Sequence, residues 1–143
     1  MKALKFLSIL IVIFLTLNCS SDDDVSVSEQ KSPTQQLLMS GKWYLTSVSG
    51  QTRNNCEKQS YYHFKTEDSL IQEYIKTNAV DECVTDGTYS LNYLLLNNDS
   101  ELLTREGSSS LIYQIDSISD SQLILKLDEG SLSRGFRILT FEK

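Results

Sequence analysis

Beyond residue 40, the apolar residues of this chain come in short runs that are separated by turn-forming residues. The runs are rich in Tyr, Ile, Leu, Phe and Thr, which is typical of β-strands. Residues 34–39 have a helical pattern instead, because Pro33 suits a helix start and Gly41 suits a helix end. The sequence therefore predicts an all-β fold with a short N-terminal helical turn. We expect eight strands, at about residues 41–49, 59–65, 70–76, 87–91, 93–97, 111–118, 122–127 and 135–142.

The connections between these strands predict an antiparallel sheet. They are too short for the crossover helices that parallel strands need. Asn92 is expected to form a tight turn between the fourth and fifth strands, since Asn tolerates positive φ, and the polar segment 98–109 is expected to be a loop. Such a sheet protects its edges either by closing into a barrel or by folding into two layers. Strand spacing alone leaves both architectures open.

The first 18 residues predict a signal peptide. Lys2 and Lys5 precede a mostly apolar stretch, Phe6–Leu17, which is shorter than the roughly 20 residues of a membrane-spanning helix. A transmembrane helix is the minor alternative. The stretch ends in Thr16-Leu17-Asn18-Cys19, which resembles the bacterial lipobox. This resemblance implies that Cys19 is acylated, for example with palmitate, and becomes the N-terminus of a membrane-anchored protein.

Residues 19–32 predict a disordered acidic tether, since they offer too little apolar surface to offset the entropy of ordering. The acidic residues Asp22–Asp24 resemble the signal that sends Bacteroidetes lipoproteins to the cell surface, and the alternative is a solvated linker. The expected location is the outer membrane, lipid-anchored and exposed at the cell surface. Residues 33–143 are then expected to form one small domain.

The charge balance argues against a nucleic-acid partner. When Lys2 and Lys5 leave with the signal peptide, 11 of the 13 basic side chains remain against 19 acidic ones, a net charge of −8. Nucleic-acid binding depends on basic residues that neutralise phosphates. An acidic surface suits a solvated extracellular protein but identifies no partner.

Cys56 and Cys83 are expected to pair. Disulfides persist outside the inner membrane, and two remaining cysteines in a small exported domain most simply bond to each other. A metal site is the alternative, but the chain has a single His and no Cys-x-x-Cys, which leaves too few ligands for zinc.

A series of residues along the predicted domain resembles the lipocalin-like domains of Bacteroidetes lipoproteins. It comprises Leu38, Gly41–Leu45, Phe64, Gly87–Ser90, Leu94, Leu96 and Ile138–Phe141. The resemblance implies an eight-stranded antiparallel up-and-down barrel, entered by a short helical turn that closes one end. It also implies that Gly41 and Trp43 belong to that closed end. An arginine of the last strand would cap Trp43, with Arg137 the first choice and Arg134 the second.

The residues that could carry out catalysis form no known motif. His63 is the only histidine and lies between Tyr62 and Phe64, with no nucleophile motif nearby. Asp81, Glu82 and Asp86 do not have the spacing of a calcium loop. We therefore expect a protein that is not an enzyme, with no catalytic residue, no metal and no cofactor.

Several tyrosines in the predicted strands could line a ligand pocket, since tyrosine combines apolar area with a polar tip. The candidate pocket residues are Tyr61, His63, Tyr74, Tyr89 and Tyr113. The leading hypothesis is a monomeric, surface-tethered barrel that binds a small apolar ligand. The alternative is a structural or interaction protein that contacts another surface protein or a glycan through its outer face or loops. An enzyme is the third hypothesis, and it needs His63 in a cleft beside carboxylates or a hydroxyl.

Overall fold

A computed structural model describes residues 31–128 and 135–143, which belong to one unit, Lys31–Lys143. The predicted signal peptide, Cys19, most of the predicted tether and Arg134 lie outside the described residues. No helix in the described part of the chain is long and apolar enough to cross a membrane. The helical elements are α2 (Pro33–Leu38) and the 3-10 helix η1 (Glu57–Gln59). The strands are β1 (Lys42–Val48), β2 (Gln51–Thr52), β3 (Tyr61–Phe64), β4 (Ser69–Thr77), β5 (Cys83–Leu96), β6 (Glu101–Glu106), β7 (Ser109–Ile118), β8 (Gln122–Asp128) and β9 (Phe136–Glu142).

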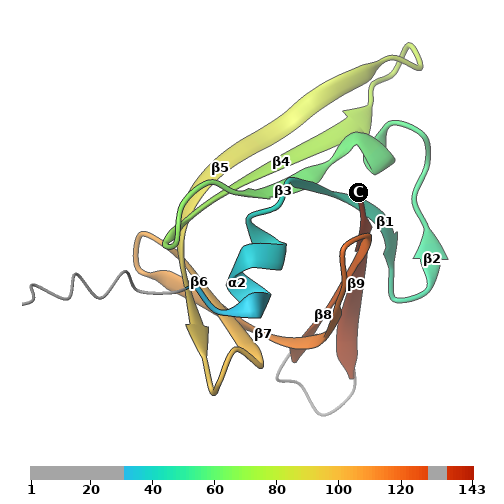
Figure 1. Ribbon diagram of the computed structural model, residues 1–143. Coiled ribbons are helices and arrows are strands. Elements are labelled where there is room, and N and C mark those ends of the chain that lie inside the picture. Colours follow the sequence, from blue (N-terminus) through green and yellow to red (C-terminus); the bar gives the residue numbers. More distant parts are fainter. Residues whose placement is uncertain (1–30, 129–134) are drawn as a thin grey trace, which may run out of the picture. The chain divides into compact units, whose positions relative to one another are not determined.

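The strands form a closed antiparallel barrel (Figure 1). Each strand from β3 to β9 pairs with its neighbour in the chain, and β1 pairs with both β3 and β9. Strand β2 adds only a two-residue pairing to the far end of β1. Since closure leaves no long unpaired edge between β1 and β9, it resolves the choice between barrel and sandwich. The prediction of an eight-stranded up-and-down barrel with a short N-terminal helix is confirmed.

Two strand predictions are wrong. Residues predicted as separate fourth and fifth strands form one strand, β5, in which Asn92 is not a turn but pairs with Ser69 and with Arg105. The segment predicted as a polar loop contains β6, whose Leu102 and Thr104 are buried inside the barrel. The number of barrel strands, with the short β2 set aside, agrees with the prediction only because β5 joins two predicted strands and β6 adds one that was not predicted.

Helix α2 covers one end of the barrel (Figure 1). The Ser32 side chain caps it by accepting a hydrogen bond from the Gln35 amide at 3.1 Å, and Pro33 occupies the first turn. Leu38, the last residue of α2, is fully buried, and its carbonyl accepts the Trp43 Nε1–H at 2.9 Å. The helix is thereby joined to the start of β1 and closes this end.

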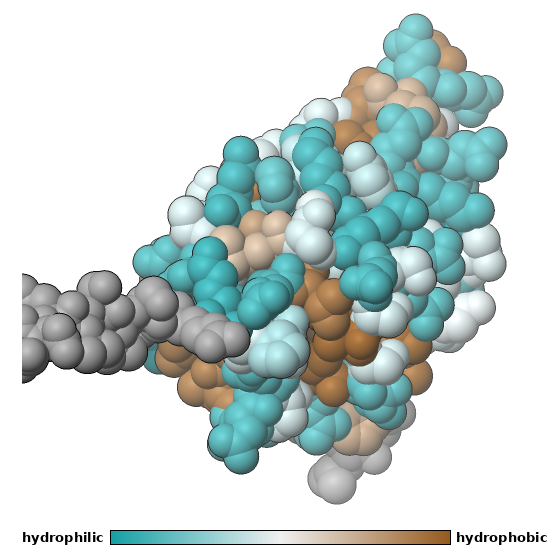
Figure 2. Space-filling model, viewed as in Figure 1, coloured by the Kyte–Doolittle hydropathy of each residue, from teal (hydrophilic) through white to brown (hydrophobic). Residues whose placement is uncertain are grey.

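The core fills the closed end of the barrel. Alternate residues of each strand point inward, and those near α2 are large and apolar. The Tyr62 and Phe141 rings lie 4.6 Å apart, and Phe64 packs edge-on against Tyr93 at 5.0 Å. Figure 2 shows hydrophobic residues grouped near the middle of this face and mostly hydrophilic residues over the projecting β4–β5 hairpin. The fully buried apolar residues are Leu38, Trp43, Phe64, Leu70, Leu102, Leu123, Leu125 and Phe141.

The predicted capping of Trp43 by Arg137 is wrong. The cation over the Trp43 ring is the Lys143 ammonium, 4.1 Å from the ring centroid. Along β9, Glu142 pairs with Tyr44 beside Trp43, whereas Arg137 is the second residue of the strand, roughly 16 Å away at ~3.3 Å per residue. Gly41 directly precedes β1, and a Cβ there would meet no atom within 4 Å, so packing does not require glycine at this position.

Candidate functional site

The end of the barrel opposite α2, called the mouth below, is not filled by side chains. It holds a cavity of about 230 Å³, and a smaller hollow of about 100 Å³ adjoins it between β5 and the turn from β6 to β7. The two share Gln72, Leu111 and Tyr113, so they form one continuous concave surface. The cavity is lined by Leu45, Val48, Arg53, Tyr62, Gln72, Tyr74, Leu111, Tyr113, Leu127, Arg137 and Leu139.

Much of the cavity wall is aliphatic. Leu45 and Val48 of β1, Leu111 of β7, Leu127 of β8 and Leu139 of β9 belong to four of the strands around the barrel. Side-chain alternation along the strands places Leu111, Leu127 and Leu139 on the inner face. The bulge after Leu45 brings Val48, which pairs with Leu139, to the same face. An apolar molecule in the cavity would therefore contact aliphatic side chains from several directions.

Tyrosine hydroxyls and an amide supply the polar part of the cavity. The Tyr62 and Tyr74 hydroxyls are 3.1 Å apart, and the Tyr74 hydroxyl donates to Gln72 Oε1 at 3.1 Å. Gln72 is only 6% exposed. Burial is the main cause that raises the pKa of the Tyr62, Tyr74 and Tyr113 phenols above their usual value of 10.0. The phenols are therefore neutral at physiological pH and act as hydrogen-bond donors and acceptors.

Two arginines also line the cavity. Arg53 follows β2, where its backbone amide donates to the Thr46 carbonyl at 3.0 Å. Its Nε is buried and has no hydrogen-bond acceptor within the described residues, since Glu57 Oε2 is 3.8 Å away. Arg137 is close enough to Tyr74 and Tyr113 to oppose part of the rise in pKa that burial causes in both phenols. Both guanidinium groups therefore belong to the mouth of the barrel.

A disulfide joins two segments beside the mouth. Cys56 and Cys83 are bonded, with their Cα atoms 5.1 Å apart, which confirms the predicted pairing. Cys56 ends the segment that carries Arg53, and Cys83 begins β5 in the projecting hairpin. The Ser60 hydroxyl also accepts the Ile75 amide at 2.8 Å, so the segment after β2 is attached to the hairpin at two points.

A comparison with protein families agrees with this architecture. The family model for the lipocalin-like domain matches residues 39–125. The chain belongs to the lipocalin-like domain family. A solved structure of a lipocalin-like protein from Bacteroides uniformis is 16% identical, with a TM-score of 0.48, and the match covers 75% of this chain and 99% of that one. Among curated proteins, no relative matches the chain.

Three of the predicted pocket residues lie elsewhere in this lipocalin-like domain. Tyr61 and His63 are on the outer face of β3, where the Tyr61 hydroxyl donates to Glu73 at 2.9 Å and Lys42 lies over the Tyr61 ring. The prediction that they line a pocket is wrong because their neighbours Tyr62 and Phe64 occupy the inner face.

Tyr89 is the third. It packs edge-on against Tyr74 at 5.9 Å and covers Gly87, where a Cβ would lie 2.8 Å from its ring, but it is not among the residues that line the cavity. Tyr74 and Tyr113 do line it.

Several cavity residues were missed from the sequence. Tyr62 could have been found, because it shares a strand face with Phe64, which is more apolar than His63 and so marks the inner side. Arg53 and Gln72 carried no such signal. Arg53 follows β2 and Gln72 belongs to β4, and closure of the barrel brings both to one cavity. No local sequence pattern specifies that arrangement.

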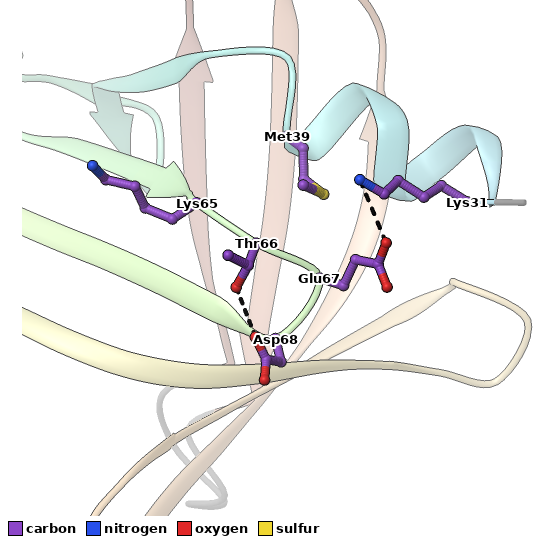
Figure 3. Close-up of a pocket in the computed structure, with 6 residues that line it drawn as sticks. All are labelled: Lys31, Met39, Lys65, Thr66, Glu67 and Asp68. Atoms are coloured by element: carbon purple, nitrogen blue, oxygen red, sulfur yellow. Dashed lines mark hydrogen bonds and ion pairs between the residues drawn. The ribbon is translucent and has the colours of Figure 1, made fainter. Parts of the chain in front are cut away.

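A second hollow lies at the closed end, between α2 and the turn from β3 to β4 (Figure 3). Lys31 reaches across it to Glu67 at 3.4 Å, Thr66 donates to Asp68 at 2.7 Å, and Met39 points into it. Its volume is about 590 Å³, but both members of the ion pair are largely exposed, so it is a shallow surface groove. The mouth cavity is less open than this groove and is the better candidate site.

The single histidine and the acidic residues do not come together as a metal site in the described part of the chain. In residues 31–128 and 135–143, no group of three or more His, Cys, Asp or Glu side chains could hold a metal ion. His63 pairs across the sheet with Lys42 and Ile71 on the outer face. Partial burial, and then the charges of Lys65 and Lys42, lower the pKa of His63 below 6.5.

Proposed function

We propose that this lipocalin-like domain binds a small, largely apolar molecule in the mouth of its barrel and catalyses no reaction. The observation that carries the proposal is the contrast between the two barrel ends: α2 and the core fill one, while the other holds an aliphatic-walled cavity of about 230 Å³. An apolar cavity of roughly 150 Å³ is enough to hold benzene, whereas drug-sized ligands occupy roughly 300–1,000 Å³. The cavity therefore suits a ligand of modest size.

The proposal includes attachment to the outer membrane through Cys19, with the barrel exposed at the cell surface. It is supported by the signal-peptide pattern of residues 1–18 and by the lipobox-like residues that end at Cys19. Two or more acyl chains are needed for stable anchoring, and each buried methylene contributes ~0.8 kcal/mol. Mass spectrometry of the N-terminal peptide should find a diacylated Cys19. Replacement by Cys19→Ser should release the protein from the membrane fraction.

Ligand binding is tested best by purifying the full chain from its host and measuring its mass under native conditions. We expect a co-purifying small molecule that disappears from the variant Leu127→Trp, because the larger ring would occupy the cavity. Leu94→Trp is the matched control: it introduces the same ring on the outer wall, where Leu94 is 53% exposed. A ligand retained by Leu127→Trp but lost from Leu94→Trp would refute the mouth as the binding site.

A second candidate function is contact with another surface protein or a glycan through the outer wall. Leu94, Leu103 and Ile112 are paired across β5, β6 and β7, and Leu94 and Ile112 are about half exposed. Such a row is an apolar strip on the outer wall of the barrel. If a partner protein co-purifies instead of a small molecule, and Ile112→Ser removes it, the interaction function replaces the proposed one.

A further inference from the structure

We propose that the ligand of the mouth cavity carries a carboxylate, which Arg53 and Arg137 bind while its apolar part lies against the leucines. This inference rests on the proposed function, because it names the chemical class of a ligand for the same cavity. The barrel places arginines rather than lysines at this cavity.

The cations of this acidic chain are unevenly distributed. The net charge is −6, and the structure describes three arginines, of which Arg53 and Arg137 line the cavity. The third, Arg105, lies on the outer wall beside Leu94 and Leu103. None of the described lysines lines the cavity. A guanidinium presents a planar fork of N–H donors that matches the two oxygens of a carboxylate, which a lysine ammonium does not.

The environment of Arg53 also favours an additional acceptor. Its Nε–H is buried without a hydrogen-bond acceptor within the described residues, and buried polar groups in folded proteins nearly always have one. The Glu57 carboxylate is 3.8 Å from Nε and accepts the Asn54 amide at 3.2 Å. Because this nitrogen is itself closed to the cavity, a ligand carboxylate would bind the other guanidinium nitrogens and place its negative charge beside the unpaired N–H.

The acidic groups near this end lie beside the cavity rather than in it. Glu57 forms an ion pair with Arg53 from the same segment and is itself partly exposed. Glu106 lines the adjoining hollow, where its charge raises the pKa of Tyr74, a smaller contribution than burial. The tyrosine hydroxyls in the main cavity stay neutral and can donate to an anion. The main cavity therefore combines cations and neutral donors with aliphatic walls.

The test compares two probes of equal chain length, octanoate and octan-1-ol, by isothermal titration calorimetry at neutral pH. The protein is the exported full chain with Cys19→Ser, so that no detergent competes for the cavity. We expect octanoate to bind at least ~10-fold more tightly, as one or two charge-assisted hydrogen bonds imply. Arg53→Gln and Arg137→Gln should each weaken octanoate binding ~10-fold and leave octan-1-ol within ~2-fold, which shows that the variant cavity is still folded.

Two further variants separate local contact from overall charge. Arg105→Gln removes one positive charge from the outer wall and should leave octanoate binding unchanged. Glu106→Gln removes a negative charge beside the cavity and should strengthen octanoate binding. Equal affinity for both probes would overturn the carboxylate inference and leave the proposed function standing. If neither probe binds, both the carboxylate inference and the proposed function fail. If Arg105→Gln weakens octanoate binding as much as Arg53→Gln and Arg137→Gln do, the carboxylate inference is overturned as well.

Discussion

Removal of the Cys56–Cys83 disulfide should lower the free energy of unfolding by about 3.6 kcal/mol, because the bond closes a loop with a sequence separation of 27 residues in the unfolded chain. The variant Cys56→Ala/Cys83→Ala tests this without leaving a buried hydroxyl where Cys56 is only 7% exposed. With a urea m-value of about 1–3 kcal/mol/M, the unfolding midpoint should fall by about 1.2–3.6 M. Trp43 is the only tryptophan and fully buried, so its fluorescence reports the transition.

Chemical reduction of the unmodified protein is the matched control and should produce the same change in midpoint as the double variant. The disulfide acts mainly by restricting the unfolded chain, so the native barrel should persist without it. Amide chemical-shift changes should be confined to η1 and the start of β5, which flank the two cysteines. A loss of stability below about 1 kcal/mol, or shift changes that extend to β6–β8, would refute this reasoning.

Three other outcomes follow from the same geometry. Trp43→Phe should lower the free energy of unfolding in urea by about 2–4 kcal/mol, since it leaves the buried Leu38 carbonyl without its donor. Lys143→Ala should lower it by less than about 1 kcal/mol, and equal effects would contradict the larger role given to the Trp43 hydrogen bond. Because the pKa of Tyr62 is raised in the native state, its contribution to stability should be constant below about pH 10 and be lost above it, as the unfolded chain ionises. Unfolding measured alongside phenolate absorbance checks this, and Tyr62→Phe should reduce the fall in stability above about pH 10. His63 should titrate below 6.5 by NMR, and His63→Gln should not change ligand affinity; a loss of affinity would place this residue in the site.

The closed end of the barrel could be predicted from sequence better than the mouth. Pro33, the short helix and Trp43 near the start of β1 are local features, and each is where the sequence predicts it. The mouth depends on residues far apart in the chain, such as Arg53 and Arg137, whose proximity arises only from barrel closure through β1 and β9. Local propensity also failed at β5, where Asn92 remains extended because strands on both sides hydrogen-bond to it.

The length of β5 has a consequence for how copies of this protein behave at high concentration. Its residues 83–92 pair with β4, but its pairing with β6 covers only Asn92–Leu96, so one side of the projecting hairpin presents a strand edge. Such edges recruit strands from other molecules and start aggregation. The register shift at Tyr74/Ile75 bends the hairpin, and the Lys76–Asp86 ion pair places charges on it, so the edge is neither flat nor uncharged. The hairpin therefore carries its own protection against intermolecular β-sheet formation.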